Sequence, residues 1–85
     1  MNKLYIERET DTDGKTPIFY TALKSQMEDT VVQNVFTMFD IFISSWGGDM
    51  LWWMEDEKTE GLFECLEVVG VEVVFVNSLK EARGR

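Results

Sequence analysis

The sequence is notable first for what it lacks: it has no histidine, one cysteine and one proline in 85 residues. Without histidine, the usual nucleophile–base pairs cannot be assembled. No Gly-x-Ser-x-Gly motif and no phosphate-binding glycine loop is present either. We therefore predict a protein that is not an enzyme and that has no cofactor.

The lone Cys65 cannot form an internal disulfide, and it falls on the apolar side of a predicted helix. This use of cysteine is typical of a reducing compartment, so we expect a cytoplasmic protein. No apolar run approaches the ~18 residues of a membrane-spanning helix. The first nine residues have no long apolar core, so we expect no targeting segment.

Basic residues are also scarce, with 8 Lys and Arg against 16 Asp and Glu and a net charge of −8. This balance argues against direct binding of nucleic acid or of an anionic membrane. It favours a basic protein partner, or charge that serves solubility alone. The charged fraction of 28% is accompanied by 45% hydrophobic residues, which excludes a disordered chain.

A strand–helix–strand pattern organises the second half of the chain. Met50 to Met54 and Val71 to Val76 are apolar runs of strand length. Between them, Leu62 and Leu66 keep helical spacing opposite a set of glutamates, and Gly70 follows where a helix needs a left-handed terminator. The pattern predicts a parallel β-α-β crossover.

The N-terminal segment predicts a β-hairpin, because two short apolar runs flank an Asp-Thr-Asp-Gly turn at residues 11–14. Pro17 should stand at the start of the second strand or on an unpaired edge, which makes the hairpin peripheral. Glu9, Asp11, Asp13 and Gly14 align with the opening of an EF-hand loop, but its twelfth position would be Tyr20 instead of a bidentate glutamate. We expect no metal site.

Ser25 and Glu28 have the spacing of a capping box, and a long helix is expected from there to about Trp46. Polar positions keep steps of three and four, which leaves an apolar stripe for burial. The stripe consists of Val32, Val35, Phe36, Phe39, Phe42 and Ile43. Gly47 and Gly48 would end the helix.

Together these elements predict a single α+β domain over residues 1–76, in the order β-β-α-β-α-β, with a four-stranded mixed sheet and two helices. Residues 77–85 are expected to form a polar, flexible tail.

Both later strands are apolar on both sides, as in interior strands of a parallel sheet. If both crossovers are right-handed, both helices cover one face and the other is bare. A partner, a second copy or a reversed strand order would then cover that face.

Negative charge is concentrated in one quarter of the chain. Between Asp49 and Glu72 there are eight carboxylates and one lysine, a net charge of −7. The predicted helix places Glu60, Glu64 and Glu67 in an exposed row that continues the acidic turn at residues 55–57. The carboxylates predicted to bind a partner are Glu55, Asp56, Glu57, Glu60, Glu64 and Glu67. A solvated surface with no partner is the alternative.

Three tryptophans, Trp46, Trp52 and Trp53, fall within eight residues. Adjacent strand residues point to opposite faces, so Trp52 and Trp53 cannot both enter the same core. We therefore add both to the candidate partner-binding residues, because one of them should lie partly exposed, and tryptophan is enriched at interface hot spots.

The leading hypothesis is a small acidic binding protein, an inhibitor that occupies the basic, nucleic-acid-binding site of a partner such as a nuclease by acting as a nucleic-acid mimic. In size, acidity and lack of catalytic groups the chain resembles small phage-encoded inhibitors, anti-CRISPR and anti-restriction proteins among them. That resemblance is one of type, and no residue role is taken from it. The alternative is a structural or assembly subunit that forms a homodimer or larger homo-oligomer through an apolar sheet face.

Overall fold

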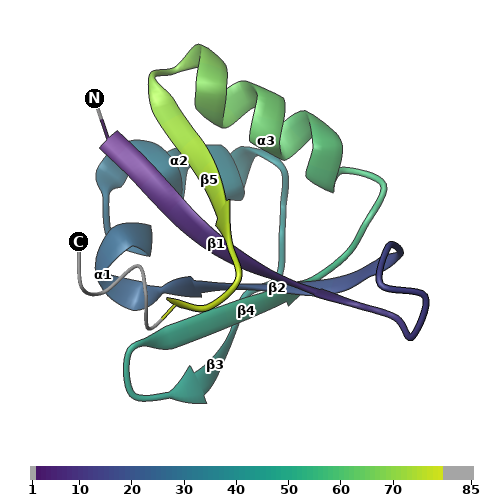
Figure 1. Ribbon diagram of the computed structural model, residues 1–85. Coiled ribbons are helices and arrows are strands. Elements are labelled where there is room, and N and C mark those ends of the chain that lie inside the picture. Colours follow the sequence, from purple (N-terminus) through teal and green to yellow (C-terminus); the bar gives the residue numbers. More distant parts are fainter. Residues whose placement is uncertain (1, 80–85) are drawn as a thin grey trace.

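The computed structural model describes residues 2–79, except for the side chains of Asn2 and Trp46. The elements are β1 (Asn2–Thr10), β2 (Pro17–Leu23), α1 (Lys24–Met27), α2 (Thr30–Met38), β3 (Ser44–Gly47), β4 (Met50–Met54), α3 (Thr59–Val68) and β5 (Val71–Val76). The described residues thus form a small α+β domain with three helices and a mixed five-stranded sheet (Figure 1). The predicted α+β class is confirmed. We had predicted four strands and two helices, one fewer of each than the described residues contain.

The N-terminal hairpin lies at the centre of the sheet, where we had expected a peripheral position. The strand order is β3-β4-β2-β1-β5, with β1 and β2 antiparallel to each other. Pro17 occupies only the first residue of β2, so the rest of that strand keeps its N–H groups. Ala22 accordingly pairs with Ile6 on one side, and Tyr20 pairs with Trp53 on the other.

The predicted β-α-β crossover is present in a split form. β4 is antiparallel to β2, and β5 is parallel to β1, so β4 and β5 run in the same direction with the hairpin between them. This places β5 at an edge of the sheet, against the expectation of an interior strand. One backbone group of this strand is hydrogen-bonded by a side chain, because the Val73 N–H donates to the Glu67 carboxylate at 3.0 Å. This bond makes the edge less available for pairing with another strand.

The long helix expected from Ser25 to Trp46 was wrong. Asp29 interrupts it, since its Oδ1 accepts hydrogen bonds from the N–H groups of Val31 and Val32 at 2.9 and 3.2 Å and begins α2. At the other end Asp40 adopts a left-handed φ of 54°, which ends the helix. Residues 44–47 then form β3, and the turn at Gly48 leads into β4.

The two candidate caps allow a direct test. Asp29→Ala should lower the free energy of unfolding by about 1 kcal/mol, because two N–H groups at the start of α2 lose their acceptor. Ser25→Ala should change it much less, since α1 has no side-chain cap. Urea denaturation followed by circular dichroism measures both. A larger loss for Ser25→Ala than for Asp29→Ala would restore the capping-box interpretation.

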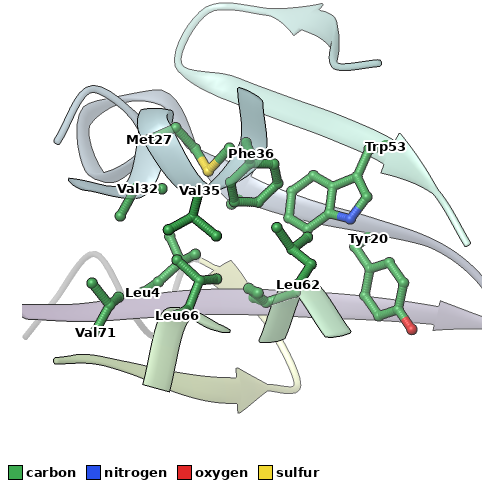
Figure 2. Packing of buried hydrophobic residues seen from close by; sticks show 12 residues of the cluster. Leu4, Tyr20, Met27, Val32, Val35, Phe36, Trp53, Leu62, Leu66 and Val71 are labelled. Atoms are coloured by element: carbon green, nitrogen blue, oxygen red, sulfur yellow. The ribbon is translucent and has the colours of Figure 1, made fainter. Parts of the chain in front are cut away.

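The core lies between the three helices and one face of the sheet (Figure 2). Twelve buried hydrophobic residues form it. The strands contribute Leu4, Ile6, Tyr20, Ala22, Trp53 and Val71, and the helices contribute Met27, Val32, Val35, Phe36, Leu62 and Leu66. By strand register all six strand residues project from the same face. The sequence left open whether the helices share one face of the sheet or flank it, and in the structure they share one face.

Part of the predicted apolar stripe lies outside this core. Phe39 is only partly buried and its ring lies against Gly61 of α3. Ile43 is also partly buried, and Phe42 is 84% exposed. The helical spacing was extrapolated past Met38, where the backbone no longer follows it.

The helix-free face of the sheet is partly covered by the chain itself. Leu79 is buried, and its N–H donates to the carboxylate of Glu7 at 3.0 Å. Glu7 alternates with Ile6 and so points to the helix-free face. Figure 1 shows the segment after β5 turning back across the strands. The packed chain thus reaches residue 79, and the remainder of the expected tail, residues 80–85, lies outside the described residues.

Candidate partner-binding surface

The acidic turn between β4 and α3 is shaped by hydrogen bonds that it makes to itself. Asp56 Oδ1 accepts from the Lys58 N–H at 2.9 Å, and the Asp56 N–H donates to Thr59 Oγ1 at 3.1 Å. The Thr59 N–H in turn donates to the Asp56 carbonyl at 3.0 Å. This reciprocal arrangement satisfies backbone groups at the start of α3. Asp56 therefore shapes the turn that leads into α3, and it is a candidate contact as well.

The outer face of α3 carries the predicted carboxylate row. Glu60, Glu64 and Glu67 are exposed, while Leu62 and Leu66 on the opposite side are buried at 0% exposure. Residues three and four apart on a helix are neighbours, about 5–6 Å between Cβ atoms. The structure thus brings the three glutamates onto one face, as the spacing predicted.

The six predicted carboxylates differ in what else they contact. Glu67 closes the edge of β5 through its bond to the Val73 N–H. Glu55 is half-buried, accepting from the Tyr20 hydroxyl through Oε2 and from the Asp56 N–H through Oε1 at 3.1 Å. Glu57, Glu60 and Glu64 are exposed, and they are the carboxylates of this surface that are best placed to contact a partner.

Tyr20 and Glu55 are hydrogen-bonded to each other beside the acidic turn. Tyr20 is 4% exposed and stacks on Trp53 with ring centroids 5.7 Å apart. Burial raises the pKa of its phenol above the ordinary value of 10.0, and the hydrogen bond to Glu55 and its negative charge raise that pKa further. Tyr20 therefore stays neutral and holds Glu55 in place at neutral pH.

This coupling predicts a pH effect. Because the folded pKa is raised, Tyr20 contributes stability that is complete below about pH 10 and is lost as the pH rises through the folded pKa. Glu55→Gln should shift the phenolate absorbance of Tyr20 to lower pH, and burial should keep it above the ordinary value. An identical titration curve in Glu55→Gln and the parent protein would show that the carboxylate is not coupled to the phenol.

The two adjacent tryptophans of β4 point to opposite faces, as expected, but only one reaches the surface. Trp53 is 1% exposed and packs edge-on against Phe36 with ring centroids 5.0 Å apart. It cannot contact a partner while the domain is folded, so its inclusion among the partner-binding residues was wrong. Trp52 is half-buried on the helix-free face, and its ring centroid lies 5.9 Å from that of Phe19. Trp46 is not described at the side-chain level.

Sequence reasoning missed a hollow beside the acidic turn. The segment after α2 passes the end of β4 and leaves a cavity of about 250 Å³. Its lining includes the apolar side chains of Phe42, Trp52 and Met54 and the carboxylates of Asp40 and Asp56. We had predicted that Phe42 lies in the core on a long helix, so the sequence offered no reason to expect an exposed Phe42 beside a hollow. The left-handed Asp40 that creates it carries no sequence signal comparable to a glycine.

The described residues offer no group of three or more Cys, Asp or Glu side chains arranged to hold a metal ion. In the loop that resembles the opening of an EF-hand, Asp13 binds its own turn. Its Oδ1 accepts from the Lys15 and Thr16 N–H groups, and Oδ2 accepts from Thr16 Oγ1 at 2.5 Å. These bonds lower the pKa of Asp13 to about 2, the Thr16 hydroxyl having the largest effect. Asp13 acts here as a turn-stabilising residue.

Comparison of the chain with protein-family models, with curated proteins and with solved structures found no match. Across residues 2–79, no helix has the length and apolar character needed to cross a membrane.

Proposed function

We propose that this protein is a small acidic inhibitor that binds the basic, nucleic-acid-binding site of a partner protein in the cytoplasm. The carrying observation is the exposed carboxylate surface of the turn and α3, above all Glu57, Glu60 and Glu64. The net charge of −7 between Asp49 and Glu72 falls largely on this surface. The proposal places the protein with phage inhibitors of the anti-CRISPR and anti-restriction type.

Two physical arguments favour recognition over solvation. Like charges at helical spacing destabilise a helix by about 0.2–0.5 kcal/mol per pair, and alternating lysines would serve solubility equally well. Channels that bind DNA are lined by Lys and Arg for a dense row of phosphates. A helix backbone presents such a channel with a row of negative charges whose spacing is already set before binding.

A second candidate is self-association through the helix-free sheet face. Met54 is 54% exposed, and it lies on that face with half-buried Trp52 and Phe19. Exposed apolar patches mark interfaces. Light scattering after size exclusion separates the two, because a stable dimer at micromolar concentration favours this candidate and a monomer favours a hetero-partner.

The proposal is tested by affinity capture from cells, with the parent protein and a Glu60→Lys, Glu64→Lys double variant as baits. A nucleic-acid-binding protein should be retained by the parent bait, released by moderate salt, and missing from the variant. Salt should act strongly, because exposed charge pairs are screened over a Debye length of about 8 Å near physiological ionic strength. Equal recovery on both baits would contradict the proposed surface.

A further inference from the structure

The hollow beside the acidic turn combines an exposed aromatic ring with two carboxylates. Phe42 is 84% exposed, and Met54, which also lines the hollow, is 54% exposed. Asp40 and Asp56 also line the hollow and are exposed themselves. The hollow therefore presents apolar and acidic side chains together to a binding partner.

The loop that presents Phe42 is held in place. Asp40 adopts a φ of 54°, in a region that residues other than glycine visit rarely and that costs free energy. The Lys58 ammonium donates to the Phe39 carbonyl at 3.2 Å and ties the loop to the start of α3. Lys58 is not among the described residues that line the hollow. Among those residues, Asp40 and Asp56 are negatively charged and none is positively charged.

We infer that the hollow receives one arginine side chain of the partner, an inference that rests on the proposed binding to a basic protein. The methylene stem would lie on Phe42 and Met54, as long cationic side chains do on apolar surfaces. The planar guanidinium would stack on the Trp52 indole and donate to Asp40 and Asp56. Arginine fits better than lysine, because it combines stacking with several donors in fixed directions.

The position of the hollow makes it an anchor for the acidic surface. Asp56 belongs both to the hollow and to the turn that begins α3, so the two sites are continuous. Binding energy in interfaces is concentrated in a few well-packed aromatic and arginine contacts, surrounded by weaker polar ones. The carboxylates of α3 would thus attract the partner, and the hollow would fix its orientation.

The inference is tested without the partner, by NMR titration of the intact protein with three short glycine-flanked peptides that carry arginine, lysine or citrulline. Citrulline has the shape of arginine without its charge. We expect the arginine peptide to shift the Trp52 indole N–H and the Met54 methyl signal, with the lysine peptide at least threefold weaker and the citrulline peptide inactive.

Matched variants locate the binding. Phe42→Ala and the Asp40→Asn, Asp56→Asn double variant should each weaken the arginine peptide at least fivefold. Asparagine adopts the left-handed conformation at position 40 and can accept the Lys58 N–H bond at position 56, so folding should persist. The control for Phe42→Ala is Val68→Ala, which removes an equally exposed apolar side chain on α3. The control for the double aspartate variant is Asp11→Asn, Glu28→Gln, which changes the net charge equally. Neither control should affect binding of the arginine peptide.

The outcomes separate this inference from the proposed function. Shifts at Glu60 and Glu64 without shifts at Trp52 and Met54 would overturn the arginine site and leave the acidic surface intact. Equal binding of the lysine and arginine peptides would overturn the preference for arginine. Shifts of Trp52 that follow protein concentration alone would assign the hollow to a second copy of the chain, and would also overturn the inference.

Discussion

Replacement of Trp53 by alanine is expected to unfold the domain at or near physiological temperature. Removing a large buried aromatic side chain costs about 3–5 kcal/mol, close to the whole stability of many small domains, which starts at about 5 kcal/mol. Trp53 is 1% exposed and contacts both Tyr20 of β2 and Phe36 of α2 through its ring. Its loss would separate the sheet from the helix layer. Urea denaturation followed by circular dichroism measures the effect.

Two further substitutions show whether the effect arises from packing. Among the described residues, the buried Trp53 Nε1–H has no hydrogen-bond acceptor. An unsatisfied buried donor costs about 1–3 kcal/mol, so Trp53→Phe, which removes that donor and keeps a ring, should cost roughly half as much as Trp53→Ala or less. Trp52→Ala should also be milder, because Trp52 is only half-buried. A Trp53→Ala protein that melts within a few degrees of the parent would contradict the described core.

The double reversal Glu60→Lys, Glu64→Lys is expected to weaken partner binding by about 4-fold to several hundred-fold. Each exposed ion pair is worth about 0.2–1 kcal/mol, and reversal replaces the attraction by repulsion of similar size. Two reversals therefore remove about 0.8–4 kcal/mol, and each 1.4 kcal/mol is a factor of ten in affinity. Folding should persist, since both positions are exposed and lysine is a good helix former. Glu67 is left unchanged because it closes the β5 edge.

A charge-matched control separates position from net charge. Asp11→Lys, Glu28→Lys changes the net charge by the same amount, but Asp11 lies in the β1–β2 loop and Glu28 lies between α1 and α2. Isothermal titration calorimetry with the purified partner should show nearly parental affinity for this control. Equal losses in both double variants would mean that the partner responds to overall charge and not to the α3 surface.

The local elements that repeat a clear period could be predicted from the sequence. α3 and β5 were found because Leu62 and Leu66 keep helical spacing and Gly70, with its φ of 93°, ends that pattern before a run of valines. The segment 39–47 could not be placed, since its apolar residues continue the helical spacing of α2. Its turn depends on Asp40 adopting a left-handed conformation, which tertiary packing decides and sequence does not signal.

The candidate site was predictable in its charge and not in its shape. Exposure of the glutamates on α3 follows from helical spacing alone. The additional roles of Glu55 and Glu67 depend on which strands lie beside them, and that of Asp56 depends on the geometry of its own turn. The burial of Trp53 in place of Trp52 depends on which sheet face the helices cover. A strand pattern that is apolar on both sides leaves that choice open.

The most direct test of nucleic-acid mimicry is a competition titration, in which this protein is added to a fluorescently labelled DNA or RNA bound to the captured partner. Mimicry predicts that fluorescence anisotropy falls to the value of free nucleic acid at saturation, with a midpoint that rises steeply with salt. The Glu60→Lys, Glu64→Lys variant should not displace the nucleic acid at the same concentrations. Anisotropy that stays at the bound value while the parent protein saturates the partner would contradict the mimicry claim.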